Sequence, residues 1–404
     1  MNITDVGHLT GDDDTGVDKL EKGAKKTGKT VWDLAKFYTE FFFKTTDALN
    51  ILRPDIIAKA TDHIPEMVQL IKKLQEKDFI YETKEAVYFN TAKFKDYGKL
   101  SGQKLTDKKI KARADVYLDP EKKNATDFAL WFKRVGRFAA HTMHWNSPWG
   151  DGFPGWHIEC SAMSMKYLGE TIDIHAGGVD HIAVHHENEI AQSEGATGKP
   201  FVRFWFHNNF LTIAGQKMSK SLGNFFTIED LNKHRIEPLA LRYLFLQSHY
   251  RQVLNFTWDS AKAAEEGYNK LKAYVRTLQK QTQRTTLSAE KLKKLEDLRQ
   301  RFIAAISNDL QTTDAVAITW ELVKSSIPSG DKLDLLFEFD QVLGLKLNEV
   351  REEKIPEEIA ILKKQRDEAR KQKNFKKSDE IRKEIETKGF VLDDTETETV
   401  IKKA

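Results

Sequence analysis

One cysteine, one histidine and one glutamate stand at spacings that suit a shared metal ion. Cys160 lies in a segment with helical apolar spacing, and His185 and Glu189 follow in the run HHENE further along the chain. Residues four apart share one face of an α-helix, so His185 and Glu189 can reach the same ion. A thiolate, an imidazole and a carboxylate together suit Zn²⁺ better than Mg²⁺ or Ca²⁺. The alternative, which the residue types alone favour, is a small buried cysteine with surface or capping histidines nearby.

A lysine-containing loop and a glycine–aspartate turn are further chemical candidates. The segment GQKMSKSLGN, at 215–224, carries Lys217 and Lys220 after an expected strand. Mobile lysines can neutralise charge on a leaving pyrophosphate, and glycines let the loop close and reopen. Upstream, Gly178 and Asp180 follow another expected strand, an arrangement that suits a nucleotide with the carboxylate on a ribose hydroxyl. An ordinary surface loop and a plain turn are the alternatives.

Motif positions and composition exclude several classes of protein. A zinc protease of the HExxH type would need a histidine where Ile190 stands, and GDDDTG at 11–16 lacks the pattern of an EF-hand, so we expect a solvated loop there. The 404 residues, 31% of them charged and 40% hydrophobic, suggest two or three domains with a large core. A net charge of only +3 means that any nucleic acid must meet a local basic face.

The same composition leads to an expected compartment. The chain has one cysteine, no apolar run long enough to span a membrane and a polar start, MNITD. We therefore expect a protein of a reducing, cytoplasmic compartment without an internal disulfide, a membrane span or a signal peptide.

The expected elements that position these residues alternate between helix and strand in the middle of the chain. Two amphipathic helices, at 31–52 and 60–74, precede a β-rich stretch at 78–147 that resembles a small inserted domain. Between 150 and 223 the order is a helix at 155–169, a strand at 171–178, a helix at 184–196, and strands at 201–206 and 209–213. This alternation predicts a doubly wound parallel sheet. Everything after 229 is expected to be helical, over 229–247, 259–283, 288–308, 312–326, 331–347 and 356–387.

Several of these segments carry a resemblance to a known family. The pentapeptide KMSKS, at 217–221, resembles the second signature of class I aminoacyl-tRNA synthetases. The chain closely resembles cysteinyl-tRNA synthetase in GWHIECSAM (155–163), GGVDH (177–181), HHENEIAQSE (185–194), FLTIAGQKMSKSLGNFFTIEDL (210–231), DFALWF (127–132) and SPWGDGFPGWHIEC (147–160). The similarity runs through nearly the whole chain.

The resemblance implies a fold and a domain order. We expect an α/β protein with an incomplete Rossmann-like doubly wound parallel sheet and a small insertion domain, followed by an all-helical C-terminal half. The implied domains are the remainder of the first half of the Rossmann-like catalytic domain at 1–77, the inserted connective domain at 78–147, the second half of the catalytic domain with the zinc site and the KMSKS loop at 148–228, a helical stem-contact and bundle domain at 229–350, and a C-terminal tRNA anticodon-binding domain at 351–404.

The resemblance also implies a role for each candidate residue. Cys160, His185 and Glu189 match three of the four zinc ligands of the family. Lys217 and Lys220 would act on ATP as catalytic lysines, with Mg²⁺ on the phosphates. Trp156 would form a wall of the pocket for the substrate cysteine, and His175 would lie near the metal and also bind the substrate. Gly178 and Asp180 would bind ATP on its adenosine side.

The implied reaction joins cysteine to tRNA(Cys) in two steps, through cysteinyl-adenylate, in a protein that we expect to be a monomer. Cysteine and serine differ by one atom, and shape alone separates such pairs by about 1–3 kcal/mol. A zinc ion with an open position for the substrate thiolate would widen that difference, so no editing domain is expected.

The match to the family starts only after its opening strand, helix and second strand. That stretch carries the H-I-G-H signature and a further cysteine ligand, for which Gly7, His8 and Leu9 are no substitute. We therefore expect the 404-residue chain alone to be weak or inactive in adenylate formation.

A local basic face is the candidate surface for tRNA. Residues 361–383 contain ten Lys or Arg against four Asp or Glu, and their phosphate contacts would be salt-sensitive and independent of sequence. A solvated charged helix is the alternative. Two other functions remain open: a non-catalytic tRNA-binding remnant, and a cysteine ligase that acts on an amino sugar, against which the long helical half argues.

Overall fold

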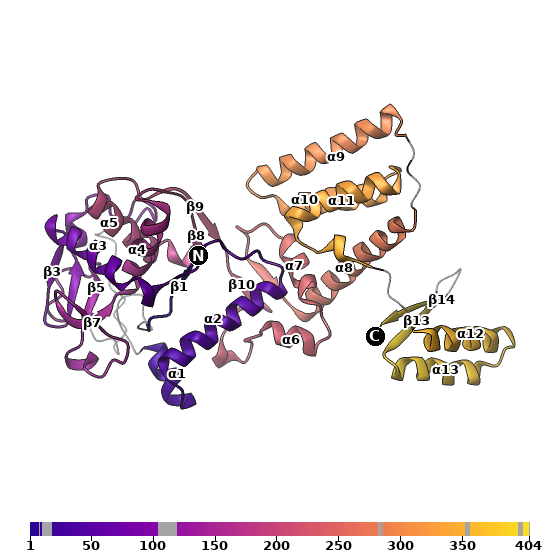
Figure 1. The fold of residues 1–404 in the computed structure, drawn as a ribbon, viewed down its shortest axis with the longest axis horizontal. Helices are drawn as coiled ribbons and strands as arrows, with labels where there is room; N and C mark the ends of the chain where they lie inside the picture. The colour runs from indigo at the N-terminus through magenta and orange to yellow at the C-terminus, as the bar shows by residue number, and fades with distance from the viewer. Residues whose placement is uncertain are drawn as a thin grey trace.

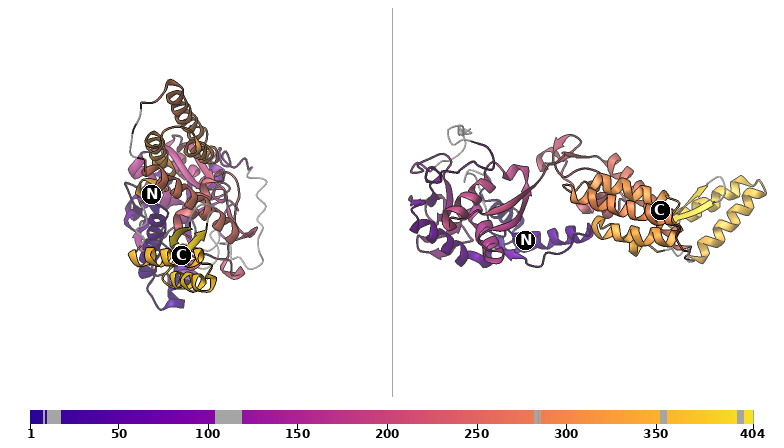
Figure 2. Two further views of the ribbon diagram at one scale, coloured as in Figure 1. Left: turned by 90° about the vertical axis from the view of Figure 1, so that its right-hand side faces the viewer. Right: turned by 90° about the horizontal axis from the view of Figure 1, so that it is seen from above.

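The computed structural model describes residues 1–7, 9, 18–103, 119–281, 284, 286–351, 356–394 and 399–403 (Figure 1). The loop expected at 11–16 lies outside these residues. The N-terminal α/β part, the helical bundle and the C-terminal unit follow one another along the longest axis, as the view from above in Figure 2 also shows. None of the described helices is long and apolar enough to cross a membrane.

An antiparallel sheet with two buried faces forms the centre of the N-terminal part. Its strand order is β3 (Ile80–Glu82), β4 (Ala86–Phe89), β5 (Phe128–Lys133), β7 (Gly150–Pro154) and β6 (Trp145–Ser147). Val87, Phe89 and Leu130 pack in one core with helices α3 (Ile64–Glu76), α4 (Trp156–Leu168) and α5 (His185–Thr197). Tyr88 and Phe132 pack on the opposite face. The short β segments expected in this region are confirmed, and their sheet extends beyond residue 147.

The parallel strands form two separate pairs. β1 (Asn2–Ile3) pairs with β2 (Ala58–Lys59), and β8 (Ile172–Gly178) pairs with β9 (Val202–Asn208). Within the described residues, no strand connects the β1–β2 pair to the β8–β9 pair by hydrogen bonds. On the β8–β9 pair, the neighbouring Ile174 and Phe204 are 65% and 69% exposed. The topology therefore shows a mixed α/β arrangement without the continuous doubly wound sheet that the alternation predicts.

The lysine-containing loop begins in a small mixed sheet. β10 (Leu211–Ile213) is antiparallel to β11 (Gln216–Lys217) and parallel to β12 (Leu254–Phe256). β12 lies in the region that we expected to be wholly helical, so that expectation is wrong here. The run Val253 to Phe256 is too short for a helix, and its backbone pairs with β10 instead.

Two helices of the N-terminal part lie outside the sheets. α1 (Lys19–Thr27) was not expected, and α2 (Val31–Ala48) agrees with the helix predicted at 31–52. Thr30 and Asp33 form a capping box at the start of α2. In both Figure 1 and Figure 2, α2 runs from the N-terminal part toward the helical bundle.

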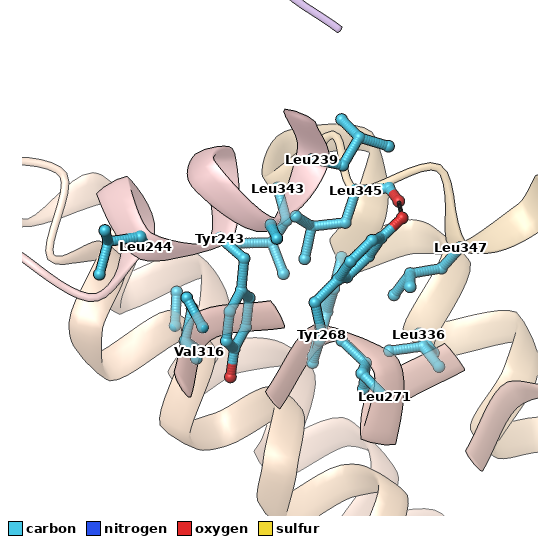
Figure 3. Packing of buried hydrophobic residues seen from close by; sticks show 14 of the residues in the cluster. Leu239, Tyr243, Leu244, Tyr268, Leu271, Val316, Leu336, Leu343, Leu345 and Leu347 are labelled. Atoms are coloured by element: carbon cyan, nitrogen blue, oxygen red, sulfur yellow. Dashed lines mark hydrogen bonds between the residues drawn. The ribbon is translucent and has the colours of Figure 1, made fainter. Parts of the chain in front are cut away.

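A helical bundle with one large apolar core follows β11. Its helices are α6 (Ile228–Lys233), α7 (Pro238–Leu246), α8 (Trp258–Gln279), α9 (Ala289–Ser307), α10 (Thr312–Lys324) and α11 (Ser329–Leu343). Figure 3 shows Leu239 and Tyr243 of α7 in this core beside Leu343 and Leu345. The helix predicted at 229–247 is divided, because Arg235 has a positive φ of 58° and Pro238 starts a new helix.

The C-terminal unit has its own small core. α12 (Glu357–Lys371) and α13 (Phe375–Thr387) pack with β13 (Phe390–Asp394) and β14 (Thr399–Lys403), which form an antiparallel hairpin. The expected single helix at 356–387 is interrupted at Lys373, where φ is 58°. The hairpin corrects the expectation of an all-helical C-terminal half: after Gly389, the β-branched and aromatic residues pair as strands.

Candidate active site

Two helices, α4 and α5, bring the candidate metal ligands together. α4 carries Cys160, and α5 carries His185 and Glu189. The Gln192 amide on α5 donates to the carbonyl of His157 at 2.5 Å and to the Ser161 hydroxyl at 2.6 Å. These buried polar bonds fix the register of the two helices, because an unpaired polar group there would cost stability.

Cys160, His185 and Glu189 form one buried group. Their candidate ligand atoms all lie within 4.8 Å of one another. The Nε2 atom of His185 lies 3.5 Å from Oε1 of Glu189. His185 is not a capping residue, since Val184 occupies the N-cap of α5 and no side chain caps it. The three side chains thus lie close enough to share one ion.

The carboxylate of Glu189 fits a site for a cation. Glu189 is fully buried, and neither of its oxygens has a hydrogen bond of normal geometry, although His175 Nε2 lies 2.9 Å from Oε2. A buried carboxylate with neither a full set of hydrogen bonds nor a cation carries a desolvation cost of several kcal/mol, of the order given for buried ions. The group can therefore hold a metal ion, with sulfur, nitrogen and oxygen donors.

The electrostatics of the group show what a cation would change. Burial raises the pKa of the Cys160 thiol well above its usual value, and the nearby Glu189 and Glu159 charges add to this. Burial also holds the pKa of His185 well below its usual value, so its imidazole is neutral. For Glu189, burial alone would raise the pKa, but His185 and His175 outweigh it and the net direction is downward. Binding of a cation would favour the thiolate over the thiol.

More histidines surround this group than the motifs predict. His157 Nδ1 lies 2.9 Å from His185 Nδ1, and His186 Nδ1 lies 2.9 Å from His207 Nε2. His175, His186 and Glu189 form a second set of candidate ligand atoms within 4.8 Å. Burial and the neighbouring His175 lower the pKa of His186 to about 2. Among these histidines, His157 could have been found from sequence, because it stands three residues before Cys160 and so on the same face of the predicted helix.

Trp156 covers the metal-binding group on the side of a cavity. Its ring centroid lies 4.3 Å from that of His185 and 5.7 Å from that of His181. The cavity has a volume of about 500 Å³ and is lined by Trp156, residues of the segment 2–6, and the α2 residues Ala35, Tyr38, Thr39 and Phe42, among others. Asn2 donates its amide to the Cys160 sulfur at 3.4 Å. An amino-acid side chain can thus be accommodated beside the metal-binding group.

His175, Gly178 and Asp180 lie on or just after β8. His175 contacts Glu189, as described above, and its pKa is raised: burial lowers it, but the Glu189 carboxylate outweighs burial. A Cβ atom on Gly178 would lie 2.3 Å from an oxygen of Asp180, and one on Gly177 would lie 2.6 Å from the His186 ring. The glycines therefore allow the 3-10 turn Val179–His181 and helix α5 to approach the strand end closely.

Lys217 and Lys220 are exposed and belong to a loop held by one asparagine. Asn224 accepts a hydrogen bond from the Ser219 backbone N–H at 2.8 Å and donates to the Lys217 carbonyl at 3.1 Å. The ammonium of Lys220 lies 5.2 Å from the centre of the Phe225 ring. The two Asn224 bonds lie within the segment 215–224, whereas Trp156, Cys160, His175, His185 and Glu189 form one cluster.

Comparisons with known proteins place this site in a family. Residues 2–266 match the family described as the tRNA synthetases class I (C) catalytic domain. A cysteine–tRNA ligase from Treponema denticola is 43% identical, over all of this chain and 87% of the relative. The chain belongs to the cysteine–tRNA ligase family of class I aminoacyl-tRNA synthetases. The resemblance in the motifs is therefore confirmed.

Other relatives agree with this family. The cysteine–tRNA ligase of Thermus thermophilus is 41% identical over 98% of this chain and 84% of its own length. Among solved structures, methionyl-tRNA synthetase of Mycobacterium tuberculosis bound by methionyl-adenylate has a TM-score of 0.56 at 16% identity, covering 87% of this chain and 77% of that chain. That likeness supports the class I fold within the family.

Proposed function

We propose that this chain joins cysteine to tRNA(Cys) at the expense of ATP, through a cysteinyl-adenylate. One observation carries the proposal: the buried side chains of Cys160, His185 and Glu189 lie together beside a cavity. The chain that contains them belongs to the cysteine–tRNA ligase family. A sulfur-binding donor set in that place suits an amino acid whose side chain is a thiol.

Cys160, His185 and Glu189 would hold Zn²⁺. When bound, zinc supplies a Lewis-acidic position that prefers a thiolate to a hydroxyl. The protein residues shape this preference: Glu189 stays ionised between two imidazoles, and burial keeps His185 neutral and able to act as a ligand. Trp156 would exclude water from one side of the group, because its ring lies against that of His185 with the centroids 4.3 Å apart.

The remaining candidate residues would handle the nucleotide and the substrate. Lys217 and Lys220 would neutralise the phosphates of ATP, which enters with Mg²⁺, as pyrophosphate leaves. Gly178 and Asp180 would face the adenosine, where the glycine gives room and the carboxylate accepts from a ribose hydroxyl. His175 would orient Glu189 toward the metal through the contact of 2.9 Å.

The helical bundle and the C-terminal unit would bind tRNA. We propose catalytic segments at 1–77 and 148–228, a connective domain at 78–147, a stem-contact and bundle domain at 229–350, and an anticodon-binding domain at 351–404. Exposed lysines and arginines on α12 and α13 support the last assignment, because phosphate contacts need accessible cations. The monomeric state and the cytoplasmic location stay predictions.

The experiment compares amino acids in ATP–pyrophosphate exchange and in tRNA charging. Any exchange or charging that the chain catalyses should depend on cysteine, even if it is weak as expected above, and serine at equal concentration should support neither reaction above background. Cys160→Ser should lower kcat/KM for cysteine about a hundredfold or more and reduce the zinc content. Met165→Leu, a change of similar volume on the same helix, is the control and should change kcat/KM by less than about threefold.

Three outcomes would contradict this proposal. Equal ATP–pyrophosphate exchange with serine and with cysteine would show that the site does not recognise sulfur. Cysteine-dependent exchange with transfer to an amino sugar in place of tRNA would make the chain a different ligase. Binding of tRNA with no exchange for any amino acid would make it a non-catalytic tRNA-binding protein.

A further inference from the structure

Arg242 ties three distant segments together at the junction of α2 and the helical bundle. Its Nε atom donates to the Leu343 carbonyl at 2.6 Å, and Nη1 donates to the carbonyls of Leu49 and Asn50, both at 2.9 Å. The Asn50 amide completes the contact by donating to the Gly344 carbonyl at 2.9 Å. A planar guanidinium with several fixed donors suits such a meeting of backbone carbonyls better than a lysine does.

The backbone around Arg242 is shaped for this contact. Gly344 has a φ of +65°, and a Cβ atom there would lie 2.5 Å from Nη2 of Arg242. Asn50 also has a positive φ, 53°, which a non-glycine residue adopts at a cost. The buried Asp340 carboxylate accepts from the backbone N–H groups of Leu345 and Leu347, both at 2.7 Å, and so fixes the segment after Gly344. These features fix the positions of the backbone carbonyls that accept from Arg242.

Helix α2 is secured at its two ends and only lightly along its length. Val31 and Leu34 near its start are its buried residues, and Leu49, just past its end, lies in the core of the helical bundle. Between the ends, Ala35, Tyr38, Thr39 and Phe42 line the cavity that also contains Trp156. The position of this cavity wall relative to the helical bundle therefore depends on how firmly the end of α2 is held to the bundle.

We propose that Arg242 is a positioning residue that fixes the end of α2 to the helical bundle and so aligns the cavity beside Trp156 with bound tRNA. The proposal rests on the proposed function, because it assigns the bundle to tRNA and the cavity to the amino acid. Arg242 lies outside that cavity and acts through the carbonyls of Leu49 and Asn50. Adenylate formation needs the cavity and the ATP-binding residues but not the bundle, whereas transfer needs the cavity and the bundle in register.

The first measurement is hydrogen exchange of the backbone in the full chain. Arg242→Ala should speed hydrogen exchange in peptides that cover 43–52, since the Leu49 and Asn50 carbonyls lose the guanidinium that donates to them, while peptides of α4 and α5 stay unchanged. Arg299→Ala is the control: this arginine of the same bundle contacts only the side chains of Glu296 and Glu338 in its recorded bonds, and exchange at 43–52 should not change. Unchanged exchange at 43–52 in Arg242→Ala would overturn the proposal.

The second measurement separates positioning from a general loss of structure. Arg242→Ala should lower kcat/KM for tRNA in charging about tenfold or more and change ATP–pyrophosphate exchange less than about twofold. Arg242→Lys, which keeps one donor group, should recover part of the loss. Asn50→Gly keeps the positive φ and removes only the hydrogen bond from the Asn50 amide to the Gly344 carbonyl, so it should give a smaller effect of the same kind. This variant tests the proposal if Arg242→Ala folds poorly.

The outcomes distinguish this proposal from the proposed function. An equal loss in ATP–pyrophosphate exchange and in tRNA charging would overturn the positioning role, because it would show that Arg242 supports the overall stability of the chain. If the unchanged chain neither exchanges nor charges with cysteine, the proposed function fails, and the hydrogen exchange at 43–52 still decides whether Arg242 holds α2.

Discussion

At the scale of single residues, Glu189 is where the contacts of the site meet. His175 lies 2.9 Å from one carboxylate oxygen and His185 lies 3.5 Å from the other. Burial would raise the pKa of the Glu189 carboxyl, but contact with His185 and His175 outweighs burial, and the pKa is lowered. The same residue belongs to both candidate ligand sets. Its position, more than that of the cysteine, defines the centre of the site.

A buried tyrosine gives a prediction about pH. Burial raises the pKa of Tyr268 above its ordinary value of 10.0, and the charges of Glu237 and Asp340 add to this. The unfolded chain therefore ionises first, so the free energy of unfolding falls as the pH rises above about 10. Tyr268→Phe should cost about 1 kcal/mol at neutral pH through its lost bond to Leu345, and should flatten the alkaline fall.

Urea unfolding between about pH 7 and pH 11 tests this expectation. Tyr274→Phe, on the same helix but partly exposed, is the control and should leave the slope against pH unchanged. A slope in Tyr268→Phe that equals that of the unchanged chain would show that Tyr268 does not carry the effect.

At the scale of elements, helix α5 uses two faces for two tasks. His185 and Glu189 face the metal-binding group, while Glu187 accepts from the backbone N–H groups of Gly98, Leu100 and Ser101 at 3.0, 2.8 and 2.5 Å. Asn188 accepts from the Tyr97 hydroxyl at 2.6 Å. The helix thus connects the metal-binding group with the segment 97–101.

Removal of the Glu187 carboxylate should release that segment. Glu187→Ala leaves three backbone donors with fewer partners, so we expect a loss of about 1–3 kcal/mol in the free energy of unfolding and faster hydrogen exchange at 98–101. Glu170→Ala, an exposed residue paired with Lys199, should cost less than about 1 kcal/mol. Equal effects of the two changes in chemical denaturation would contradict this role.

The helices and short strands around the site could be predicted from sequence, but their assembly could not. The i,i+4 spacing of His185 and Glu189 predicts a shared helical face, and the observed α5 at 185–197 agrees closely with the predicted 184–196. The contacts of Glu187 with residues 98–101 join segments far apart in the sequence, and periodicity carries no information on such pairs. Breaks at Arg235 and Lys373 were missed because these residues adopt positive φ without a glycine signal.

The sheets show the same limit. Short β-like segments identified β4 and β8, but strand order depends on hydrogen bonds between distant segments. The prediction of one parallel sheet used only the order of helices and strands, which does not fix whether β1–β2 and β8–β9 are joined. The hairpin β13–β14 was hidden by the charged residues on either side of it.

At the scale of the whole molecule, charge is nearly balanced but unevenly placed. The net charge is +3, yet the segment 361–383 holds ten basic and four acidic residues. Lys364, Lys371 and Lys376 on α12 and α13 are exposed. Figure 1 shows this unit at the opposite end of the molecule from α3, α4 and α5. A long RNA that contacts both ends would suit this arrangement.

The salt dependence of tRNA binding tests the basic segment. Binding should weaken as salt rises, and the triple change of Lys364, Lys371 and Lys376 to Glu should reduce the slope of log Kd against log salt by roughly one for each lost phosphate contact. Lys26→Glu on α1, outside the segment, should leave the slope unchanged. The same slope in the triple variant would exclude these lysines from the RNA interface.

The most direct test of the central claim is an optical titration of the cobalt-substituted chain. With Co²⁺ held by Cys160, His185 and Glu189, a charge-transfer band from sulfur to cobalt should be present in the near ultraviolet. Added cysteine should increase this band as a second thiolate binds, and serine should not. A spectrum that cysteine leaves unchanged, or that serine changes equally, would contradict the claim that this group recognises the amino acid by its sulfur.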